Sequence, residues 1–207
     1  MTSTILFEEK PAANGKRIGV ATLNAPKALN ALSLDMVVLL AEKLSTWQKD
    51  NTIACVLLQG AGDKVFCAGG DIRKLYQSIL ENPQGPNAYA EEFFSTEYRL
   101  DYAIHRYSKP LICWGHGIVM GGGLGLMSGA GYRVVTETTH IAMPEIGIGL
   151  YPDVGASWFL ARMPGHTGLF AGLTGCKINA ADALFVGLAD RFISSDKKTT
   201  FDQALLA

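Results

Sequence analysis

Two stretches of this 207-residue chain follow the same order of apolar run, glycine-rich loop and helical pattern. Residues 53–59 (IACVLLQ) lead through a loop with four glycines into a helical pattern from about Asp71. Residues 111–114 (LICW) repeat the order, and a glycine triplet at 121–123 opens the next helix. A continuous apolar run is typical of a strand covered on both faces. Strand-then-helix units in series therefore predict an α/β fold with right-handed crossovers.

The rest of the chain extends this pattern. Residues 4–9 and 17–23 predict a hairpin, and Ser33 predicts the N-cap of a helix with one buried face. Further helices are expected at about 88–106, 155–162, 165–173 and 180–186, and short strands at 132–136 and 190–194. The sequence has no low-complexity tract or linker, so residues 1–207 are expected to form a single domain.

Composition excludes several classes of function. Eighteen basic and nineteen acidic residues leave a net charge of −1, which gives no electrostatic footprint for nucleic acid. No apolar run is long enough for a membrane span, and residues 1–10 lack the pattern of a secretory signal. The four cysteines are scattered without a C-x-x-C pair, so we expect a reducing compartment and no disulfide framework. We also expect no metal site, because the histidines show no ligand spacing.

The two glycine turns, FCAGGDI at 66–72 and MGGGLGL at 120–126, each stand where a loop enters a helix. A helix N-terminus presents unpaired N–H groups and the positive end of the dipole, which suits a developing oxyanion. Taken alone, either turn is equally compatible with a tight structural turn. Neither a dinucleotide fingerprint nor a nucleophile elbow fits, because Ser128 stands at the third glycine position and Leu126 precedes it by two.

Four segments then fit together in order and spacing: NAPKALNAL (24–32), KVFCAGGDI (64–72), GHGIVMGGGLGL (115–126) and AMPEIGIGLYPDVGAS (142–157). They resemble the crotonase, or enoyl-CoA hydratase/isomerase, superfamily over about residues 17–195. The resemblance implies a spiral of ββα units and an oxyanion hole made by the backbone N–H groups of Gly70 and Gly122, with Gly69 at the substrate. It also implies that the loop of Lys27, Ala28 and Leu29 lies near the adenine and ribose of coenzyme A. Coenzyme A would be part of the substrate, and no separate cofactor is expected.

The carboxylates favour one branch of that superfamily. A hydratase of the family is expected to need two glutamates, and the first of these positions is Gly125 here, while the second is present as Glu145. Asp153 in the segment YPDVG, together with Glu97 in FFSTEYRLDYAI, resembles the 3-hydroxyisobutyryl-CoA hydrolase branch. Thioester hydrolysis needs an oxyanion hole, a group that activates water and a group that protonates the thiolate. We assign Glu145 to water or acyl-transfer chemistry, Asp153 to orientation and proton transfer, and Glu97 to the acyl hydroxyl.

Structural roles compete with each assignment. Asp153 could instead cap the helix near 155, Glu97 could face solvent on a charged helix, and Glu145 could be a solvated loop acid. Asp71 is better explained as an N-cap than as a catalyst, and a catalytic pair of Cys67 and His116 is disfavoured.

The length of the chain leaves the activity open. Hydrolases of this branch are expected to be longer, with further C-terminal helices, so we expect that part to be missing here. The alternatives are another enoyl-CoA isomerase or hydratase, and a non-catalytic acyl-CoA-binding fragment. A homo-oligomer is compatible with the sequence, as is a location in the cytoplasm or, in a eukaryote, in the mitochondrial matrix.

Overall fold

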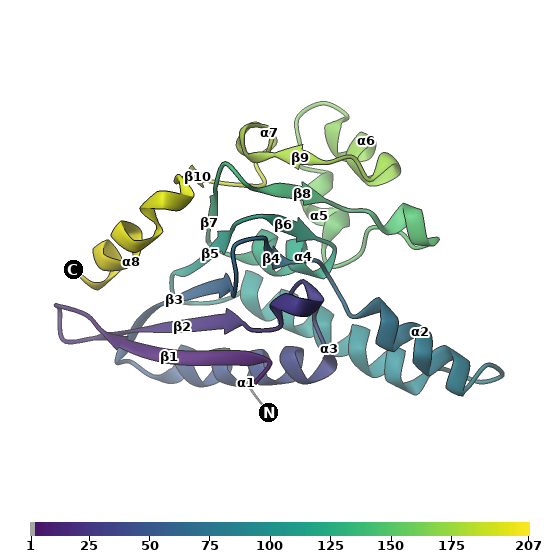
Figure 1. Ribbon diagram of the computed structural model, residues 1–207, viewed down its shortest axis with the longest axis horizontal. Coiled ribbons are helices and arrows are strands. Elements are labelled where there is room, and N and C mark those ends of the chain that lie inside the picture. The colour runs from purple at the N-terminus through teal and green to yellow at the C-terminus, as the bar shows by residue number, and fades with distance from the viewer. Residues whose placement is uncertain (1–2) are drawn as a thin grey trace.

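The computed structural model describes residues 3–207, which form two sheets flanked by helices (Figure 1). The larger sheet has the order β1 (Ile5–Pro11), β2 (Arg17–Leu23), β3 (Ile53–Gly60), β5 (Leu111–Gly115), β7 (Tyr132–Val135) and β10 (Arg191–Phe192). The smaller sheet has the order β4 (Val65–Cys67), β6 (Ile118–Met120), β8 (His140–Ala142) and β9 (Ile178–Asn179). The pairs β1–β2 and β8–β9 are antiparallel and the other strand pairs are parallel.

Three successive segments each give one strand to the larger sheet, one to the smaller sheet, and then helices. Strands β3 and β4 are followed by α2 (Ile72–Glu81) and α3 (Ala88–His105), and β5 and β6 by α4 (Gly122–Gly129). Strands β7 and β8 are followed by η2 (Glu145–Ile148), α5 (Ala156–Leu160) and α6 (Thr167–Thr174). The expected α/β fold and its spiral of ββα units are therefore confirmed.

The predicted N-terminal elements are also confirmed. Strands β1 and β2 pair from Ile5 opposite Leu23 to Pro11 opposite Arg17. The Ser33 side chain accepts a hydrogen bond from the Met36 N–H at the start of α1 (Leu34–Lys49). The side chains that α1 buries are Met36, Val37, Leu40, Leu44 and Trp47.

The strands of the smaller sheet, α8 (Lys198–Leu206) and the short helices η1 (Pro26–Ala28) and η3 (Ser195–Lys197) were not placed from the sequence pattern, although α7 (Ala180–Phe185) was. Each strand of the smaller sheet has only two or three residues, too few to show a period of two. Helix α8 packs over the face of the larger sheet that carries Val20, Leu57 and Trp114. The centroid of the Phe201 ring lies 5.1 Å from that of the Trp114 ring.

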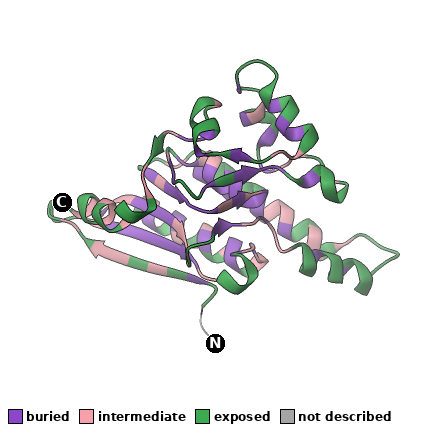
Figure 2. Ribbon diagram, turned by 45° about the horizontal axis from the view of Figure 1, so that its top comes forward, coloured by how far each residue is buried: buried purple, intermediate pink, exposed green. Residues whose placement is uncertain are grey.

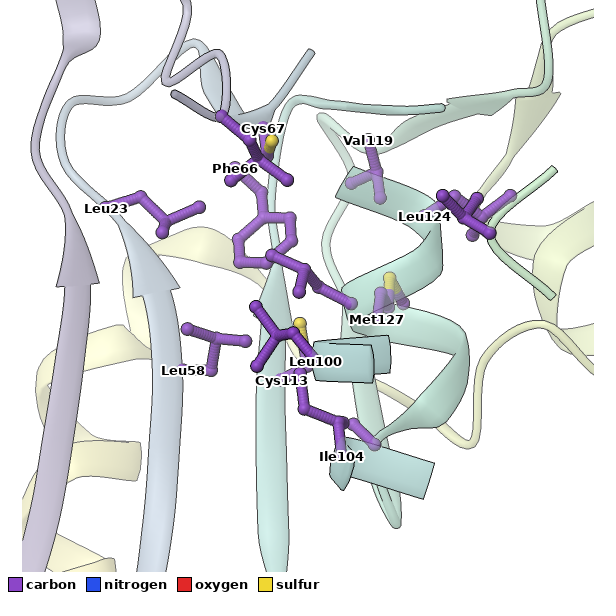
Figure 3. Close-up of a cluster of buried hydrophobic side chains, with 14 of the residues drawn as sticks. Leu23, Leu58, Phe66, Cys67, Leu100, Ile104, Cys113, Val119, Leu124 and Met127 are labelled. Atoms are coloured by element: carbon purple, nitrogen blue, oxygen red, sulfur yellow. The ribbon is translucent and has the colours of Figure 1, made fainter. Parts of the chain in front are cut away.

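The core lies where the larger sheet, α3 and α4 meet. Figure 3 shows side chains of β2, β3, β4, β5, α3 and α4 in one apolar cluster, among them Phe66, Leu100 and Met127. Buried residues gather on the strands, whereas α2 and the outer helices are largely exposed (Figure 2). This core holds α3 and α4 against the strands that lead into the two glycine turns. No helix among residues 3–207 is both long and apolar enough to cross a bilayer.

Candidate active site

One cavity of about 180 Å³ brings together six of the residues singled out in the sequence. Those residues are Gly69, Gly70, Glu97, Gly122, Glu145 and Asp153. They come from the loop after β4, from α3, from the start of α4 and from the segment after β8. The rest of the wall is mainly apolar and includes Phe93, Phe94 and Leu150. A mostly apolar cavity with a few convergent polar groups is the usual form of a small-molecule site.

The two glycine turns lie against each other. Gly69 has φ +106°, and a Cβ built there would lie 3.2 Å from the Met120 carbonyl oxygen and 3.5 Å from the Gly122 nitrogen. Only glycine combines this backbone angle with so close an approach. The Leu32 N–H donates to the Gly69 carbonyl over 2.8 Å, and the Asp71 N–H donates to the Leu32 carbonyl over 2.9 Å, which fixes the first turn.

The N–H groups of Gly70 and Gly122 are free to bind a ligand. Within residues 3–207, neither group donates a hydrogen bond to the protein. Gly122 is the first residue of α4, where the helix dipole favours negative charge. Two such donors in one cavity can hold a developing oxyanion.

Glu145 begins η2 and is only 6% exposed. The Leu150 N–H donates to its backbone carbonyl over 3.0 Å, which closes the loop under the cavity. The Glu145 Oε2 has no hydrogen-bond partner within the described residues. Burial, helped by the negative charge of Asp153, raises the pKa of Glu145 to about 7. The alternative of a solvated loop acid is therefore wrong.

Asp153 is held by a tyrosine and does not cap α5 with its side chain. The Tyr98 hydroxyl donates to Asp153 Oδ2 over 2.7 Å. The N-cap of α5 is Gly155, which receives no side-chain cap, and the Ala156 N–H donates only to the backbone carbonyl of Asp153. The carboxylate is thus left beside the cavity.

Glu97 lies on the inner face of α3 and is 2% exposed, so the solvent-facing alternative is wrong as well. Its Oε1 has no hydrogen-bond partner within residues 3–207. Burial, followed by the charges of Asp153 and Glu145, raises the pKa of Glu97 to about 8. A neutral carboxyl group at this place can donate a hydrogen bond as well as accept one.

Sequence reasoning missed two further polar groups beside these acids, Tyr98 and Asp101. Asp101 lies one turn after Glu97, is 8% exposed, and neither of its carboxyl oxygens has a partner within the described part of the chain. Burial raises its pKa well above the usual range, and the charges of Glu97 and Asp153 add to the effect. The available signal was helical spacing, since Asp101 follows Glu97 by four residues.

The remaining candidates are structural. The Asp71 side chain accepts from the Lys74 N–H and caps α2, as predicted. Cys67 is fully buried, and burial raises the pKa of its thiol to about 12, so it is no nucleophile near neutral pH. His116 Nε2 lies 2.7 Å from the Gly62 carbonyl oxygen, a contact that ties two loops together. Within residues 3–207, no three His, Cys, Asp or Glu side chains are arranged to hold a metal ion.

The loop of Lys27, Ala28 and Leu29 lies outside the cavity wall but against the first glycine turn. The Ala68 N–H donates to the Leu29 carbonyl over 3.1 Å. The three residues themselves are exposed. Their contact with coenzyme A stays a prediction.

Comparison with known proteins agrees with the fold. The family model for enoyl-CoA hydratase/isomerase matches residues 18–207. The chain is 45% identical over 204 residues to the mitochondrial 3-hydroxyisobutyryl-CoA hydrolase of Danio rerio, covering 99% of this chain and 51% of the relative. It is 43% identical over 203 residues to the mitochondrial 3-hydroxyisobutyryl-CoA hydrolase of Homo sapiens, covering 98% of this chain and 50% of the relative. The chain therefore spans about half the length of these relatives.

Solved structures show the same fold. A carnitinyl-CoA dehydratase from Mycobacterium thermoresistibile superposes with a TM-score of 0.89 at 43% identity, over 97% of this chain and 57% of that one. An enoyl-CoA hydratase from Rhodobacter sphaeroides 2.4.1 superposes with a TM-score of 0.90 at 38% identity, over 98% of this chain and 58% of that one. The family match, the identities and the shared fold lead to one conclusion: the chain belongs to the enoyl-CoA hydratase/isomerase family.

Proposed function

We propose that the protein hydrolyses a short-chain 3-hydroxyacyl-CoA thioester, such as 3-hydroxyisobutyryl-CoA, to the free acid and coenzyme A. The observation that carries the proposal is the distribution of carboxyl groups around the glycine turns. No acid can stand at position 125, because a Cβ there would lie 2.6 Å from Val154 Cβ. The cavity instead holds Glu145, Asp153 and Glu97 beside the two glycines. Relatives at 40–45% identity bear the name of this hydrolase, which supports the same reaction.

The N–H groups of Gly70 and Gly122 bind the thioester oxygen in this scheme. Attack on the carbonyl carbon places negative charge on that oxygen, and the two N–H groups stabilise the tetrahedral oxyanion. Glu145, whose pKa of about 7 leaves much of it ionised near neutral pH, accepts the proton of the attacking water. Direct attack by the Glu145 carboxylate, with water then cleaving the anhydride, is the competing route.

The other two acids complete the scheme. Collapse of the tetrahedral intermediate breaks the C–S bond, and the leaving thiolate takes up a proton from Glu145, with Asp153 orienting the substrate and sharing the transfer. Glu97 is mostly protonated near neutral pH and binds the hydroxyl of the acyl group. Acids whose pKa values are pushed apart in one cavity suit such a division of roles.

The experiment compares two substrates with one preparation of the intact protein. Release of free thiol from 3-hydroxyisobutyryl-CoA should be fast, and hydration of crotonyl-CoA should be at least about 10²-fold slower because a positioned acid is absent at residue 125. Isomerase activity would release no thiol. Rapid crotonyl-CoA hydration, or binding of acyl-CoA without any turnover, would contradict the proposal.

The proposal extends to the compartment. The zebrafish and human relatives are named as mitochondrial proteins. All four cysteines of this chain are free thiols. We propose a reducing compartment, either the cytoplasm or the mitochondrial matrix.

A further inference from the structure

A second, larger cavity is lined by chain neighbours of residues that line the candidate active site. It has a volume of about 420 Å³ and is lined by Tyr98, Asp101, Gly125, Val154 and Trp158 together with neighbouring residues. Its lining alternates along the chain with the lining of the 180 Å³ cavity. Tyr98 follows Glu97 on α3, Gly125 lies one turn after Gly122 on α4, and Val154 follows Asp153. The same three segments therefore separate the two cavities.

Val154 belongs to one of these segments and lines the larger cavity. Its side chain is 4% exposed, and its Cβ and Cγ2 lie 2.6 and 3.0 Å from the place where a Cβ of residue 125 would stand. The space that the side chain of residue 125 would take up in another family member is therefore filled by Val154. On the side of α3, the Asp101 Oδ1 lies 3.1 Å from the same point.

The backbone holds Val154 in this place at a conformational cost. Its φ is +42°, and a β-branched residue in the left-handed region is a genuine outlier. The hydrogen bond from the Tyr98 hydroxyl to the Asp153 carboxylate anchors the preceding residue to α3. Strain that the surrounding structure maintains is often found where a site needs one specific geometry.

We propose that Val154 is the specificity-determining end wall of the acyl cavity, which admits short acyl groups and shuts longer ones out of the cavity behind it. The inference rests on the proposed function, because it assumes that the two glycine N–H groups bind the thioester oxygen and that the acyl group extends from there into the cavity. A short acyl group ends at the wall, beside Glu97 and Asp153. A longer chain would have to pass between α3 and α4 at the position of the valine side chain.

The test measures binding rather than turnover. Butyl-CoA and octyl-CoA are thioethers that cannot be hydrolysed, and their affinities are compared in the intact wild-type protein and in Val154→Gly. Glycine accepts the left-handed φ and removes the wall. The ratio of octyl-CoA to butyl-CoA affinity should rise by at least about tenfold in the variant, since a hydrophobic pocket discriminates chain length on that scale. Val154→Ala serves in the same way should the glycine variant be unstable.

A second substitution tests whether Val154 fills the space beside Gly125. Gly125→Ala should lower the melting temperature in the wild-type background, where its Cβ meets Val154 Cβ at 2.6 Å. In the Val154→Gly background the same substitution should be tolerated and should restore the preference for the short chain. Tyr102→Ala, an exposed residue of α3 that lines the larger cavity, is the control and should leave the ratio unchanged.

The outcomes separate this inference from the proposed function. A folded Val154→Gly variant with the wild-type ratio of octyl-CoA to butyl-CoA affinity would overturn the role proposed for Val154. An equal change of that ratio in Tyr102→Ala would overturn it as well. Absence of thioester hydrolysis in the wild-type protein would overturn the proposed function and would leave the affinity ratio as a separate result.

Discussion

Four carboxyl groups, those of Glu97, Asp101, Glu145 and Asp153, share one small region between α3, α4 and the segment after β8. Carboxylates so placed cannot all be ionised at neutral pH, because burial and mutual repulsion both favour the neutral form. Burial is the larger cause for Glu97, Asp101 and Glu145. Some of these groups therefore hold protons at neutral pH and can donate hydrogen bonds to a ligand.

Glu145 and Asp153 are expected to act as a unit. Glu145→Gln and Asp153→Asn should each reduce 3-hydroxyacyl-CoA hydrolysis by about 10²–10⁴-fold. The double variant should be little slower than the slower single variant, because residues that act together are not additive. Steady-state kinetics of the three variants measures this. Near-normal activity of Asp153→Asn would reduce that residue to a partner of Tyr98.

The proposed role of the Gly122 N–H as an oxyanion donor can be tested with a pair of substitutions. Gly122→Ala adds a Cβ, which meets Glu97 Oε1, but keeps the N–H. Gly122→Pro adds the same Cβ, closes a ring with two further carbons and removes the N–H. Proline suits the first position of a helix, so α4 should still form. Turnover of the proline variant should be about 10²–10³-fold below that of the alanine variant, with similar affinity for coenzyme A. Equal turnover would make Gly122 a packing glycine.

Burial of Glu97 predicts how stability depends on pH. Its pKa is about 8 in the folded protein against 4.5 as the reference value, so its contribution is fully present below about pH 4.5. Stability should fall as pH rises from 5 to 8, with a contribution from Glu97 on the order of a few kcal/mol. Glu97→Gln should flatten the curve in urea unfolding, and exposed Glu92→Gln should not. A wild-type stability that rises over this range would contradict the assignment.

The sequence predicted that several acids and glycines far apart in the chain would meet in one site, whereas their catalytic roles stay predictions. Motif positions brought Glu145, Asp153 and the two glycines to one cavity. The burial of Glu97 was also readable, since it lies on the same helical stripe as Phe93, Leu100 and Ile104. The contact of Tyr98 with Asp153 was not readable, because it joins residues 55 positions apart.

At the scale of elements, the loops before α1 and β4 are tied together by the fully buried Asn30. Its Oδ1 accepts from the Ala25 N–H over 2.9 Å. Its Nδ2 lies within reach of the carbonyls of Ala61, Val65 and Phe66. These bonds hold the loop of residues 25–30 against the segment that leads into the first glycine turn.

Asn30→Ala should therefore destabilise the whole protein. It leaves buried backbone groups without partners, and each such group costs about 1–3 kcal/mol. Asn24→Ala is the matched control, because the Asn24 side chain makes one exposed hydrogen bond, to the Ser3 carbonyl. Urea unfolding should show a loss of at least about 2 kcal/mol for Asn30→Ala and under about 1 kcal/mol for Asn24→Ala. Equal losses would show that the loop is held by other contacts.

Long elements were predictable, and so were the short elements β7, β10 and α7, but the strands of the smaller sheet were not. Helices α1 and α3 carry clear caps and buried stripes, and β3 and β5 are continuous apolar runs. Strand β6 has three residues, and β9 has two, so their place in the smaller sheet is decided by pairing with distant strands. Such pairing leaves no local signal in a single sequence.

At the scale of the whole molecule, the candidate site exists only where successive turns of the spiral stack. Gly70 follows the first ββ pair, Gly122 opens the helix after the second, and Glu145 and Asp153 follow the third. Each ββα unit of the spiral thus adds one part of the cavity. The register between turns, fixed by parallel pairing of β4 with β6 and of β6 with β8, sets the distance between the donors and the acids.

The most direct test of this arrangement is the carbonyl stretching frequency of a bound thioester. A ¹³C-labelled 3-hydroxyacyl-CoA would be bound to the intact protein carrying Glu145→Gln, which is expected to slow turnover. The isotope-edited infrared difference spectrum of the bound thioester would then be recorded. Two N–H donors should polarise the C=O bond and move its stretch to a lower frequency than in water. The shift should shrink when Gly122→Pro is added. A stretch at the same frequency as for the free thioester in water would contradict the account, because the carbonyl would then lie away from the two glycine turns.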